Sequence, residues 1–480
     1  MKITFIEPPN WTGKESFERV FGCNLTIYPF PNIFTLITAG LLKNKGYDVV
    51  YIDAANMYWN EDEFDKFIQN DCSDIISIHS INLAKENDLL TLEKIRKIKK
   101  DVKIIFTGPS PTMNPGDFIK DNNVFVVRGE QELTFLEFVT TIKEKKNYND
   151  ILGLSYGLNG AILNNPVREL IEDLDSLPFP DRTLLDRDLY FCPKIGKEPW
   201  TTVLTSRGCS YRCIYCVPCS LSFSRELEYK SKYGKKPPVR KRSAKNVIEE
   251  IKLLKSQGYR SFTIIDDNFP WEQDRTLEIC RGIEELGFEW GCLSRADRIT
   301  EQIAAAFTRS GCQFVDIGVE SFDQAVLDYV KKDMKIETIY RAVDILKKYK
   351  IDVKFNILLG ASPLETEDII LNNLKIIKKL KPSTVMFSIV SPFPGTEYYE
   401  TCKKNGWFSE GDYYSIPLHK QAIVSYPDLT SVDLERLIKK LTFKYYLRPG
   451  FFLSSLKRIK SPRGLLRGLV SLKRKLSFGK

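Results

Sequence analysis

Residues 203–216 read VLTSRGCSYRCIYC, a short apolar run followed by a polar turn and three cysteines. The apolar run predicts a strand, and the cysteines follow it with the spacing Cys-x-x-x-Cys-x-x-Cys. Cuboidal iron–sulfur clusters are held by cysteine thiolates, and three thiolates from one short loop can reach three irons and leave the fourth open. Cys209, Cys213 and Cys216 are therefore candidate metal ligands, with the aromatic Tyr215 just before the third.

Other interpretations of these cysteines stay open. A zinc site usually pairs two Cys-x-x-Cys units or includes histidines, and neither is present, although three cysteines can also fall together incidentally. Cys219 offers a fourth thiolate, which would fill the open iron and leave an electron-transfer cluster. Pro218 restricts how the chain can turn back toward that iron. We therefore favour a thiol outside the cluster as the role of Cys219.

The strand before the cysteines is the first of a series. Between residues 200 and 395, runs that fit strands alternate with amphipathic runs that fit helices, among them Ala244–Gln257 and Ile336–Tyr349. The predicted strands are Thr202–Thr205, Phe262–Ile265, Phe314–Val319, Val353–Leu358 and Thr384–Ile389. This alternation predicts an α/β domain over residues 200–395, built as a partial TIM-type (β/α) barrel.

Residues 1–146 show the same alternation of strands and helices. The predicted strands are Ile3–Ile6, Asp48–Ile52, Asp74–Ile78, Lys103–Thr107 and Val124–Val127, with helices near 33–45, 61–70, 86–100 and 131–145. We expect a doubly wound parallel sheet of the flavodoxin or Rossmann type, which binds ligands at the carboxyl ends of its strands. The loops at those ends are rich in Gly, Pro and small polar residues: Glu7–Asn10, His79–Asn82, Gly108–Pro111 and Arg128–Glu130. Such loops let backbone approach a large ligand closely.

A connector is predicted between these domains, over residues 147–199. Leu154–Tyr156 and Ala161–Leu163 flank the pair Asn159-Gly160, which is a strong signal for a tight hairpin. Leu177–Asp181 contains two prolines and predicts an extended linker.

The C-terminal region, residues 396–480, is predicted to end in a basic amphipathic helical tail. No acidic residue follows Glu435, whereas 14 Lys and Arg residues do, and apolar side chains recur at helical spacing from Leu447 on. Such a helix can lie in an anionic membrane surface. It can equally be a solvated charged face that packs on the rest of the protein. A nucleic-acid partner is not expected, because the tail has few aromatic side chains for stacking and no RNA-binding module precedes it.

Composition sets the broad class of protein. The 480 residues allow two or three domains, and no stretch approaches the roughly 18 apolar residues of a membrane span. The N-terminus lacks the pattern of a signal peptide, so we expect a cytoplasmic protein whose tail could contact the inner face of the membrane. The 11 cysteines are then poor candidates for disulfides.

Four segments after the cysteine loop complete a family pattern: Asp266–Phe269, Gly318–Ser321, Phe355–Gly360 and Ser391–Thr396. Together with the cysteine spacing, they make the sequence resemble the radical S-adenosylmethionine (SAM) superfamily over about residues 200–400. The resemblance implies that SAM binds the open iron of a [4Fe–4S] cluster, and that an electron from the cluster cleaves SAM to a 5′-deoxyadenosyl radical. It also implies a reductant such as flavodoxin or ferredoxin.

The same resemblance implies which residues contact SAM. They are Tyr215, Asp266, Asp267, Glu320, Ser321, Asn356 and Gly360. One departure from the family is the segment Ser220–Lys236, which is longer and more charged than usual and leaves open what covers the cluster. No catalytic side chain is predicted.

Residues 1–146 resemble the cobalamin-binding domain that precedes the radical domain in one class of this superfamily. The matching segments are Pro8-Pro9, Pro31-Asn32-Ile33, Gly108-Pro109-Ser110, Arg128–Glu132 and, in the connector, Asp173–Pro180. The class implies cobalamin contacts at Pro9, Asn10, Pro31, Asn32, Ser80, Gly108, Pro109, Ser110, Gly129 and Glu130. The cobalt-ligating signature Asp-x-His-x-x-Gly is absent around His79. The resemblance therefore implies cobalamin without a histidine ligand, and a scaffold without cobalamin is the alternative.

The class implies a function, which is methyl transfer to an unactivated carbon. The radical would abstract hydrogen, methylcobalamin would deliver the methyl group, and a second SAM would remethylate the cobalt. The tail is similar to those of members that modify hopanoid, isoprenoid or tetrapyrrole-like substrates, so we expect a small-molecule substrate that is hydrophobic and lipid- or isoprenoid-like. Two alternatives remain: a radical SAM cyclase or oxidoreductase without methyl transfer, and a non-catalytic iron–sulfur protein with four thiolates.

Overall fold

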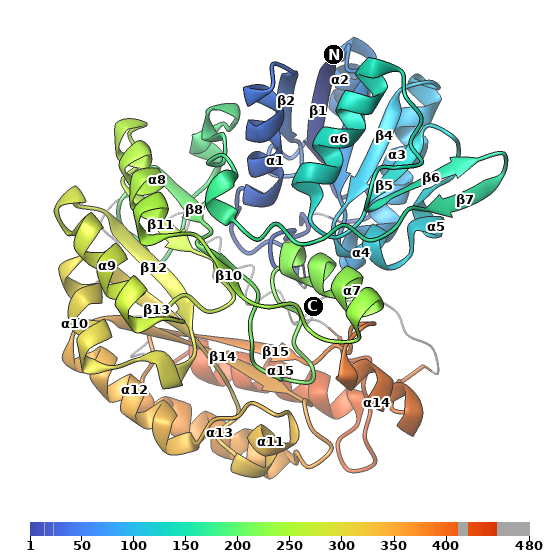
Figure 1. Ribbon diagram of the computed structural model, residues 1–480. Helices are drawn as coiled ribbons and strands as arrows, with labels where there is room; N and C mark the ends of the chain where they lie inside the picture. The colour runs from blue at the N-terminus through green and yellow to red at the C-terminus, as the bar shows by residue number, and fades with distance from the viewer. Residues whose placement is uncertain (14, 23, 411–420, 449–480) are drawn as a thin grey trace. The chain divides into compact units, whose positions relative to one another are not determined.

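The computed structural model describes residues 1–13, 15–22, 24–410 and 421–448 (Figure 1). These residues divide into two compact units, which are described one at a time. The first unit contains Met1–Tyr190 and Pro218–Lys241, and the second contains Phe191–Val217 and the described residues from Arg242 on. Each unit is built on a sheet of mostly or wholly parallel strands, so the predicted α/β class is confirmed.

The sheet of the first unit has seven strands in the order β2-β1-β3-β4-β5-β6-β7. They are β1 (Lys2–Glu7), β2 (Asp48–Asp53), β3 (Ile75–His79), β4 (Lys103–Thr107), β5 (Val124–Val127), β6 (Leu154–Leu158) and β7 (Ala161–Asn164). The first five are parallel and lie within two residues of their predicted bounds. The β6–β7 hairpin forms around Asn159-Gly160 as predicted and adds two antiparallel strands to this sheet.

Helices cover both faces of this sheet, because successive strand residues face opposite sides. The helices are α1 (Ile33–Asn44), α2 (Glu61–Asn70), α3 (Lys85–Ile98), α4 (Pro109–Met113), α5 (Pro115–Phe118), α6 (Gln131–Glu144) and α7 (Ser220–Tyr233). One core joins α1 and α6 to the face that carries Phe5, and a second core joins α2 and α3 to the face that carries Ile6. The predicted doubly wound arrangement is therefore confirmed.

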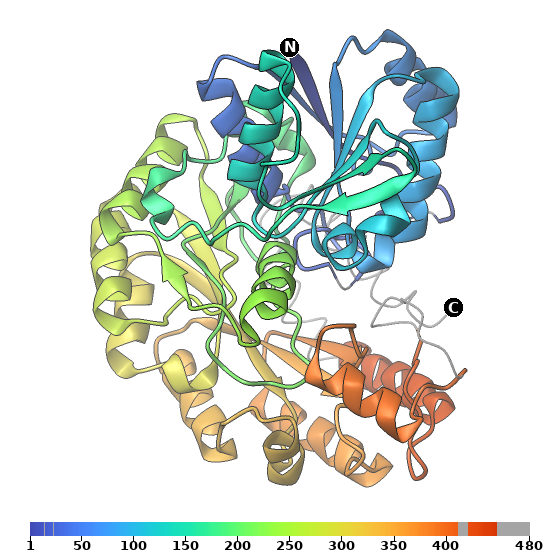
Figure 2. The ribbon, with the colours of Figure 1, turned by 45° about the vertical axis from the view of Figure 1, so that its right-hand side comes forward.

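The second unit has a six-stranded parallel sheet in the order β15-β14-β13-β12-β11-β8, which makes β8 and β15 its edge strands. Figure 2 shows the yellow-green to orange helices of this unit lying along the outer side of its strands. The strands are β8 (Trp200–Val203), β11 (Ser261–Ile264), β12 (Glu289–Ser294), β13 (Cys312–Glu320), β14 (Asp352–Leu359) and β15 (Thr384–Ile389). The helices are α8 (Ala244–Ser256), α9 (Gln273–Ile283), α10 (Glu301–Arg309), α11 (Gln324–Tyr329), α12 (Ile336–Lys348), α13 (Glu367–Leu380), α14 (Glu397–Asn405) and α15 (Ser431–Tyr446). This is the predicted partial barrel, in which neighbouring strands follow chain order.

Strand β12 was not predicted, and its sequence explains why. It has a glycine at its third position, which weakens the strand pattern. A Cβ atom at Gly291 would lie 2.2 Å from the ring of Phe314 on the neighbouring strand, so the glycine is required for close strand packing.

The start of the cation-rich C-terminal region packs on the second unit. Helix α15 buries Leu437, Leu441 and Tyr445, and the Tyr445 hydroxyl donates to the carbonyl of Pro382 at 2.7 Å. The apolar stretch of the predicted amphipathic tail, residues 449–480, lies outside the described residues, as do Cys23 and His419. Among the helices that the structure describes, none is both long and apolar enough to cross a membrane.

Candidate cofactor sites

The cysteine loop leaves β8 through a turn that two carboxylates hold. Thr205 donates from its amide and its hydroxyl to the two oxygens of Asp266, at 2.6 and 2.5 Å, and the Ser206 hydroxyl donates to the same carboxylate at 2.6 Å. The Gly208 amide donates to Asp267 at 3.0 Å. Gly208 has a φ of +94°, which favours glycine. Both carboxylates follow β11, so they tie the start of the loop to the neighbouring strand.

The three cysteines are half-buried and lie along one well-anchored loop. The Ile214 amide donates to the carbonyl of Val330 at 3.1 Å, and the Ile214 carbonyl accepts from the amide of Tyr398 at 3.0 Å. Among the described residues, no three His, Cys, Asp or Glu side chains converge as ligands of a single metal ion would. A cuboidal cluster instead takes one thiolate at each iron, which suits three thiols spread along a loop.

Two arginines that sequence analysis missed lie against this loop. The Arg295 guanidinium lies 3.4 Å from the centre of the ring of Tyr211, a residue between the first two cysteines in the sequence. The Tyr211 hydroxyl donates to Asp297 at 3.0 Å and accepts from Arg298 at 2.9 Å. Arg298 also stacks on Trp271, 4.7 Å from the ring centre. Arg295 follows the unpredicted strand β12, so no sequence signal placed it at a strand end.

Glu320 ends β13 in an unusual conformation and pairs with a buried lysine. Its φ of +67° lies in the left-handed region, and its carboxylate contacts Lys332 Nζ at 2.8 Å. A Cβ at Gly318 would lie 2.9 Å from the Glu320 carboxylate, so glycine makes room for this ion pair. Burial raises the pKa of Tyr215 well above its ordinary value, and the Glu320 carboxylate adds to the rise. The structure therefore groups these two predicted SAM contacts.

The other predicted SAM residues follow the same edge of the sheet. Asn356 lies beside Gly318 in the β13–β14 register. Ser321 is fully buried and its hydroxyl accepts from the Asn373 amide group at 3.1 Å. Gly360 has a φ of +73°, and its carbonyl accepts from the hydroxyl of Tyr398 at 2.9 Å. Ser321 and Gly360 thus have structural contacts in addition to any that SAM would make.

In the first unit, the predicted cobalamin residues lie at the carboxyl ends of β1, β3, β4 and β5. Gly108 has a φ of +99°, and a Cβ there would lie 2.4 Å from the Ser80 carbonyl oxygen. The Ser80 hydroxyl is buried and has no hydrogen-bond partner among the described residues. Pro109 and Ser110 begin α4 directly after this glycine. Gly129 has a φ of +70° after β5.

Three other predicted cobalamin residues are committed to protein contacts. Asn32 caps α1 by accepting from the Thr35 amide at 3.3 Å, and it donates to Glu7 at 2.7 Å. Asn10 donates to the carbonyl of Glu15 at 2.7 Å. Glu130 forms a buried ion pair with Arg240 and accepts from the Ile171 amide at 3.0 Å. Pro31 precedes the cap, and the Pro9 carbonyl accepts from the side chain of Asn87 at 2.9 Å.

His79 is held as a neutral structural residue. Its Nδ1 lies 3.0 Å from the Thr107 hydroxyl and its Nε2 lies 3.0 Å from the Ser220 hydroxyl. Burial lowers its pKa to about 3, with a smaller contribution from the Arg19 guanidinium. Both ring nitrogens are engaged, which agrees with the absence of the histidine signature.

Helix α7, formed by the unusual segment after the cysteine loop, belongs to the first unit. Ser220 at its start bonds to His79, and its amide donates to the carbonyl of Val20 at 2.8 Å. Farther along, Glu228 lies 3.7 Å from Arg128, and its side chain leaves little space beside Gly129. The segment therefore packs on the carboxyl edge of the first sheet.

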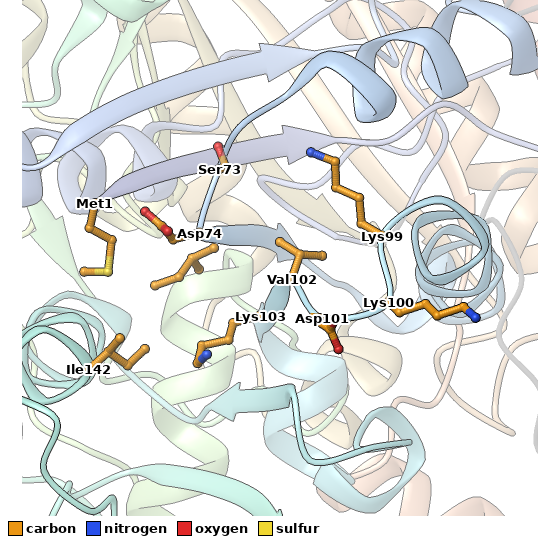
Figure 3. A pocket seen from close by; sticks show the side chains of 10 residues that line it. Met1, Ser73, Asp74, Lys99, Lys100, Asp101, Val102, Lys103 and Ile142 are labelled. Atoms are coloured by element: carbon orange, nitrogen blue, oxygen red, sulfur yellow. The ribbon is translucent and has the colours of Figure 1, made fainter.

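One hollow in the first unit lies at the opposite edge of that sheet (Figure 3). Its lining includes Met1, Asp74 and Lys103, which stand at or before the amino ends of β1, β3 and β4. Because parallel sheets bind ligands at their carboxyl ends, we do not assign this hollow to a cofactor.

Similarity to known proteins accounts for both units. Residues 203–374 match the family model of the radical SAM superfamily, and residues 28–139 match that of the B12 binding domain. The chain belongs to the radical SAM superfamily. An uncharacterized methyltransferase of Pyrococcus horikoshii is 29% identical to this radical SAM protein over 455 residues, which cover 94% of this chain and 93% of the relative.

Two further matches extend over most of this radical SAM protein. The anaerobic magnesium-protoporphyrin IX monomethyl ester cyclase of Rubrivivax gelatinosus is 26% identical, and the aligned region covers 83% of this chain and 70% of the relative. The solved structure of the cobalamin-dependent SAM radical enzyme OxsB, with aqua-cobalamin and SAM bound, has a TM-score of 0.71. The superposition covers 98% of this chain and 71% of the OxsB chain at 16% identity, so the two proteins share a fold.

This radical SAM enzyme uses a [4Fe–4S] cluster, SAM and cobalamin. The residues present fit these groups. Three thiols lie on one anchored loop at the carboxyl edge of the second sheet. At the carboxyl edge of the first sheet, Gly108 leaves no side chain between the loops, and the buried Ser80 hydroxyl offers an unused hydrogen-bonding group.

Proposed function

We propose that this enzyme transfers a methyl group to an unactivated carbon of a small hydrophobic substrate. The observation that carries the proposal is the similarity to the Pyrococcus horikoshii methyltransferase, which extends over both the B12-binding and the radical SAM regions. When bound, the cluster supplies the electron that cleaves SAM, and cobalamin carries the methyl group.

The proposal assigns roles to this chain's own residues. Cys209, Cys213 and Cys216 hold the cluster, while Asp266 and Asp267 position the loop that carries them. The SAM contacts come from Tyr215, Glu320, Ser321, Asn356 and Gly360, at the carboxyl edge of the second sheet, with Asp266 and Asp267 beside them. In the first unit, the loops that carry Pro9, Asn10, Pro31, Asn32, Ser80, Gly108, Pro109, Ser110, Gly129 and Glu130 surround cobalamin. A low-potential electron donor such as flavodoxin or ferredoxin would reduce the cluster.

A hydrophobic substrate is supported by two features. The Rubrivivax gelatinosus relative is named for a porphyrin ester, which is a small molecule with a mostly apolar ring system. The basic amphipathic sequence of residues 449–480 would place the enzyme at an anionic membrane surface, where such substrates gather. The same relative is named a cyclase, and it favours cyclisation without methyl transfer as the second candidate function.

The two functions differ in their products. We would reconstitute the enzyme anaerobically with iron, sulfide and hydroxocobalamin, and supply methyl-labelled SAM, a low-potential reductant and a lipid extract. Methyl transfer predicts both S-adenosylhomocysteine and 5′-deoxyadenosine, together with a lipid that has gained the labelled methyl group. Cyclisation predicts no labelled lipid and no S-adenosylhomocysteine, and that result would replace the methyltransferase proposal.

A further inference from the structure

Arg295 is a buried cation held against the cysteine loop. The residue is 6% exposed, and its guanidinium carbon lies over the Tyr211 ring, 3.4 Å from the ring centre. Tyr211 stands midway between Cys209 and Cys213. Arg295 also donates to the carbonyl oxygens of Lys332 and Asp333, at 2.8 and 3.1 Å, so its position does not depend on Tyr211 alone.

The counter-charge of Arg295 is more hydrated than the arginine itself. Asp297 contacts Arg295 Nε at 3.0 Å, but the side chain of Asp297 is 28% exposed and that of Arg295 only 7%. Solvent therefore screens the carboxylate more than it screens the guanidinium. Burial disfavours the charge on Arg295, but the Asp297 carboxylate offsets that cost and raises the pKa of Arg295 above its ordinary value, so the guanidinium stays charged beside the cysteine loop.

A cluster that accepts one electron gains one negative charge. The reduction potential of an iron–sulfur cluster depends on nearby charge, hydrogen bonds and solvent exposure. A fixed buried cation stabilises the reduced form more than the oxidised form, because the added charge is attracted to it. We propose that Arg295 raises the reduction potential of the cluster, with Asp297 moderating its effect, so that a low-potential donor can reduce it. The proposal rests on the assignment of the cluster to Cys209, Cys213 and Cys216.

The test is a redox titration of the reconstituted enzyme without SAM, followed by electron paramagnetic resonance. Arg295→Gln removes the buried charge. We expect the ratio of reduced to oxidised cluster at a fixed potential to fall on the order of tenfold, which corresponds to a shift of the reduction potential by about 59 mV in the negative direction. Arg212→Gln is the matched control, because Arg212 lies on the cysteine loop itself but its side chain is 71% exposed and paired with Asp333. Its substitution should leave the potential nearly unchanged.

Two more variants separate an electrostatic role from a structural one. Asp297→Asn removes the counter-charge and should move the potential in the positive direction, opposite to Arg295→Gln. Arg295→Lys keeps the charge and should restore much of the wild-type potential. If both neutral variants shift the potential in the same direction, or if neither does, the proposal is overturned. A wild-type chain that assembles no cluster would overturn the ligand assignment itself, and iron content measured beforehand distinguishes that result.

Discussion

The two sheets prepare their carboxyl edges in different ways. At the edge of the first sheet, glycine leaves space beside Ser80, and burial lowers the pKa of His79 to about 3 and raises that of Glu7 to about 8. Charged groups that remain there are paired with one another, as in the buried Glu130–Arg240 ion pair. At the edge of the second sheet, thiols stand among charged groups such as Arg295 and the Lys332–Glu320 ion pair. The same architecture can thus be adapted by leaving space or by arranging charge.

This difference agrees with the chemistry of the two ligands. Cobalamin is a large macrocycle that is held over a wide area, so backbone must come close to it and bulky side chains must stay away. An iron–sulfur cluster is small and changes its charge during the reaction, so its surroundings must bind through thiolates and stabilise charge. Substitutions at the two edges should therefore fail in different ways.

The largest effect is expected from Cys213→Ala at the second edge. Removing one of three thiolates leaves an iron without its ligand, so we expect loss of the cluster and of all SAM cleavage. Iron content and 5′-deoxyadenosine formation after anaerobic reconstitution measure this, and cobalamin binding by the first unit should survive. Cys219→Ala is the control, because Cys219 is buried and its sulfur lies 3.3 Å from the Ser222 hydroxyl. Equal iron loss in both variants would instead support a four-thiolate cluster.

At the first edge, Gly108→Ala should fill the space beside Ser80 that we assign to cobalamin, without removing a cofactor ligand. The added Cβ would lie 2.4 Å from the Ser80 carbonyl oxygen, at a φ of +99° that only glycine adopts readily. We expect a loss of about 3 kcal/mol in the free energy of unfolding, together with weaker cobalamin retention after desalting. Chemical denaturation and the cobalt content measure these two effects.

Gly46→Ala is the matched control for that variant. Gly46 has a φ of +81°, but a Cβ there would meet nothing within 4 Å. It should cost about 1 kcal/mol from backbone strain alone and should leave cobalamin retention unchanged. Equal losses of cobalamin in the two glycine variants would mean that cobalamin retention does not depend on the space at Gly108.

Sequence patterns predicted the periodic parts of this molecule well. The strands of the first sheet and the cysteine loop have strong local signals, since apolar runs and cysteine spacing are properties of neighbouring residues. Strand β12 was missed because Gly291 weakens its pattern. A glycine is needed there because the Phe314 ring from the neighbouring strand occupies the space of a side chain. Arg295 was missed with it, and the engagement of Asp266 with Thr205 and Ser206 could not be foreseen either. These contacts join residues that are far apart in the chain, so no local pattern encodes them.

The smallest effect is expected from Glu365, a buried carboxyl group beyond β14. It resembles Glu7 in the first unit, because burial raises the pKa of both groups. Glu365 is 1% exposed and accepts from the amides of Gly360 and Ala361 at 2.6 and 3.1 Å. Burial raises its pKa from an ordinary 4.5 to about 8. The folded state therefore holds this proton more tightly than the unfolded state, and stability falls as pH rises from about 4.5 to 8.

Glu365→Gln keeps an acceptor oxygen and removes the titration, so it should flatten this decline. We expect the variant to gain on the order of 2 kcal/mol over wild type between pH 5 and pH 7, measured by denaturant unfolding at each pH. Glu367→Gln is the control two residues away, where exposed contacts with Arg436 and Lys440 lower the pKa to about 2. That substitution should not change the slope over the same range. An unchanged slope in Glu365→Gln would mean that Glu365 is ionised in the folded protein, and that the second edge relies on charge even where it is buried.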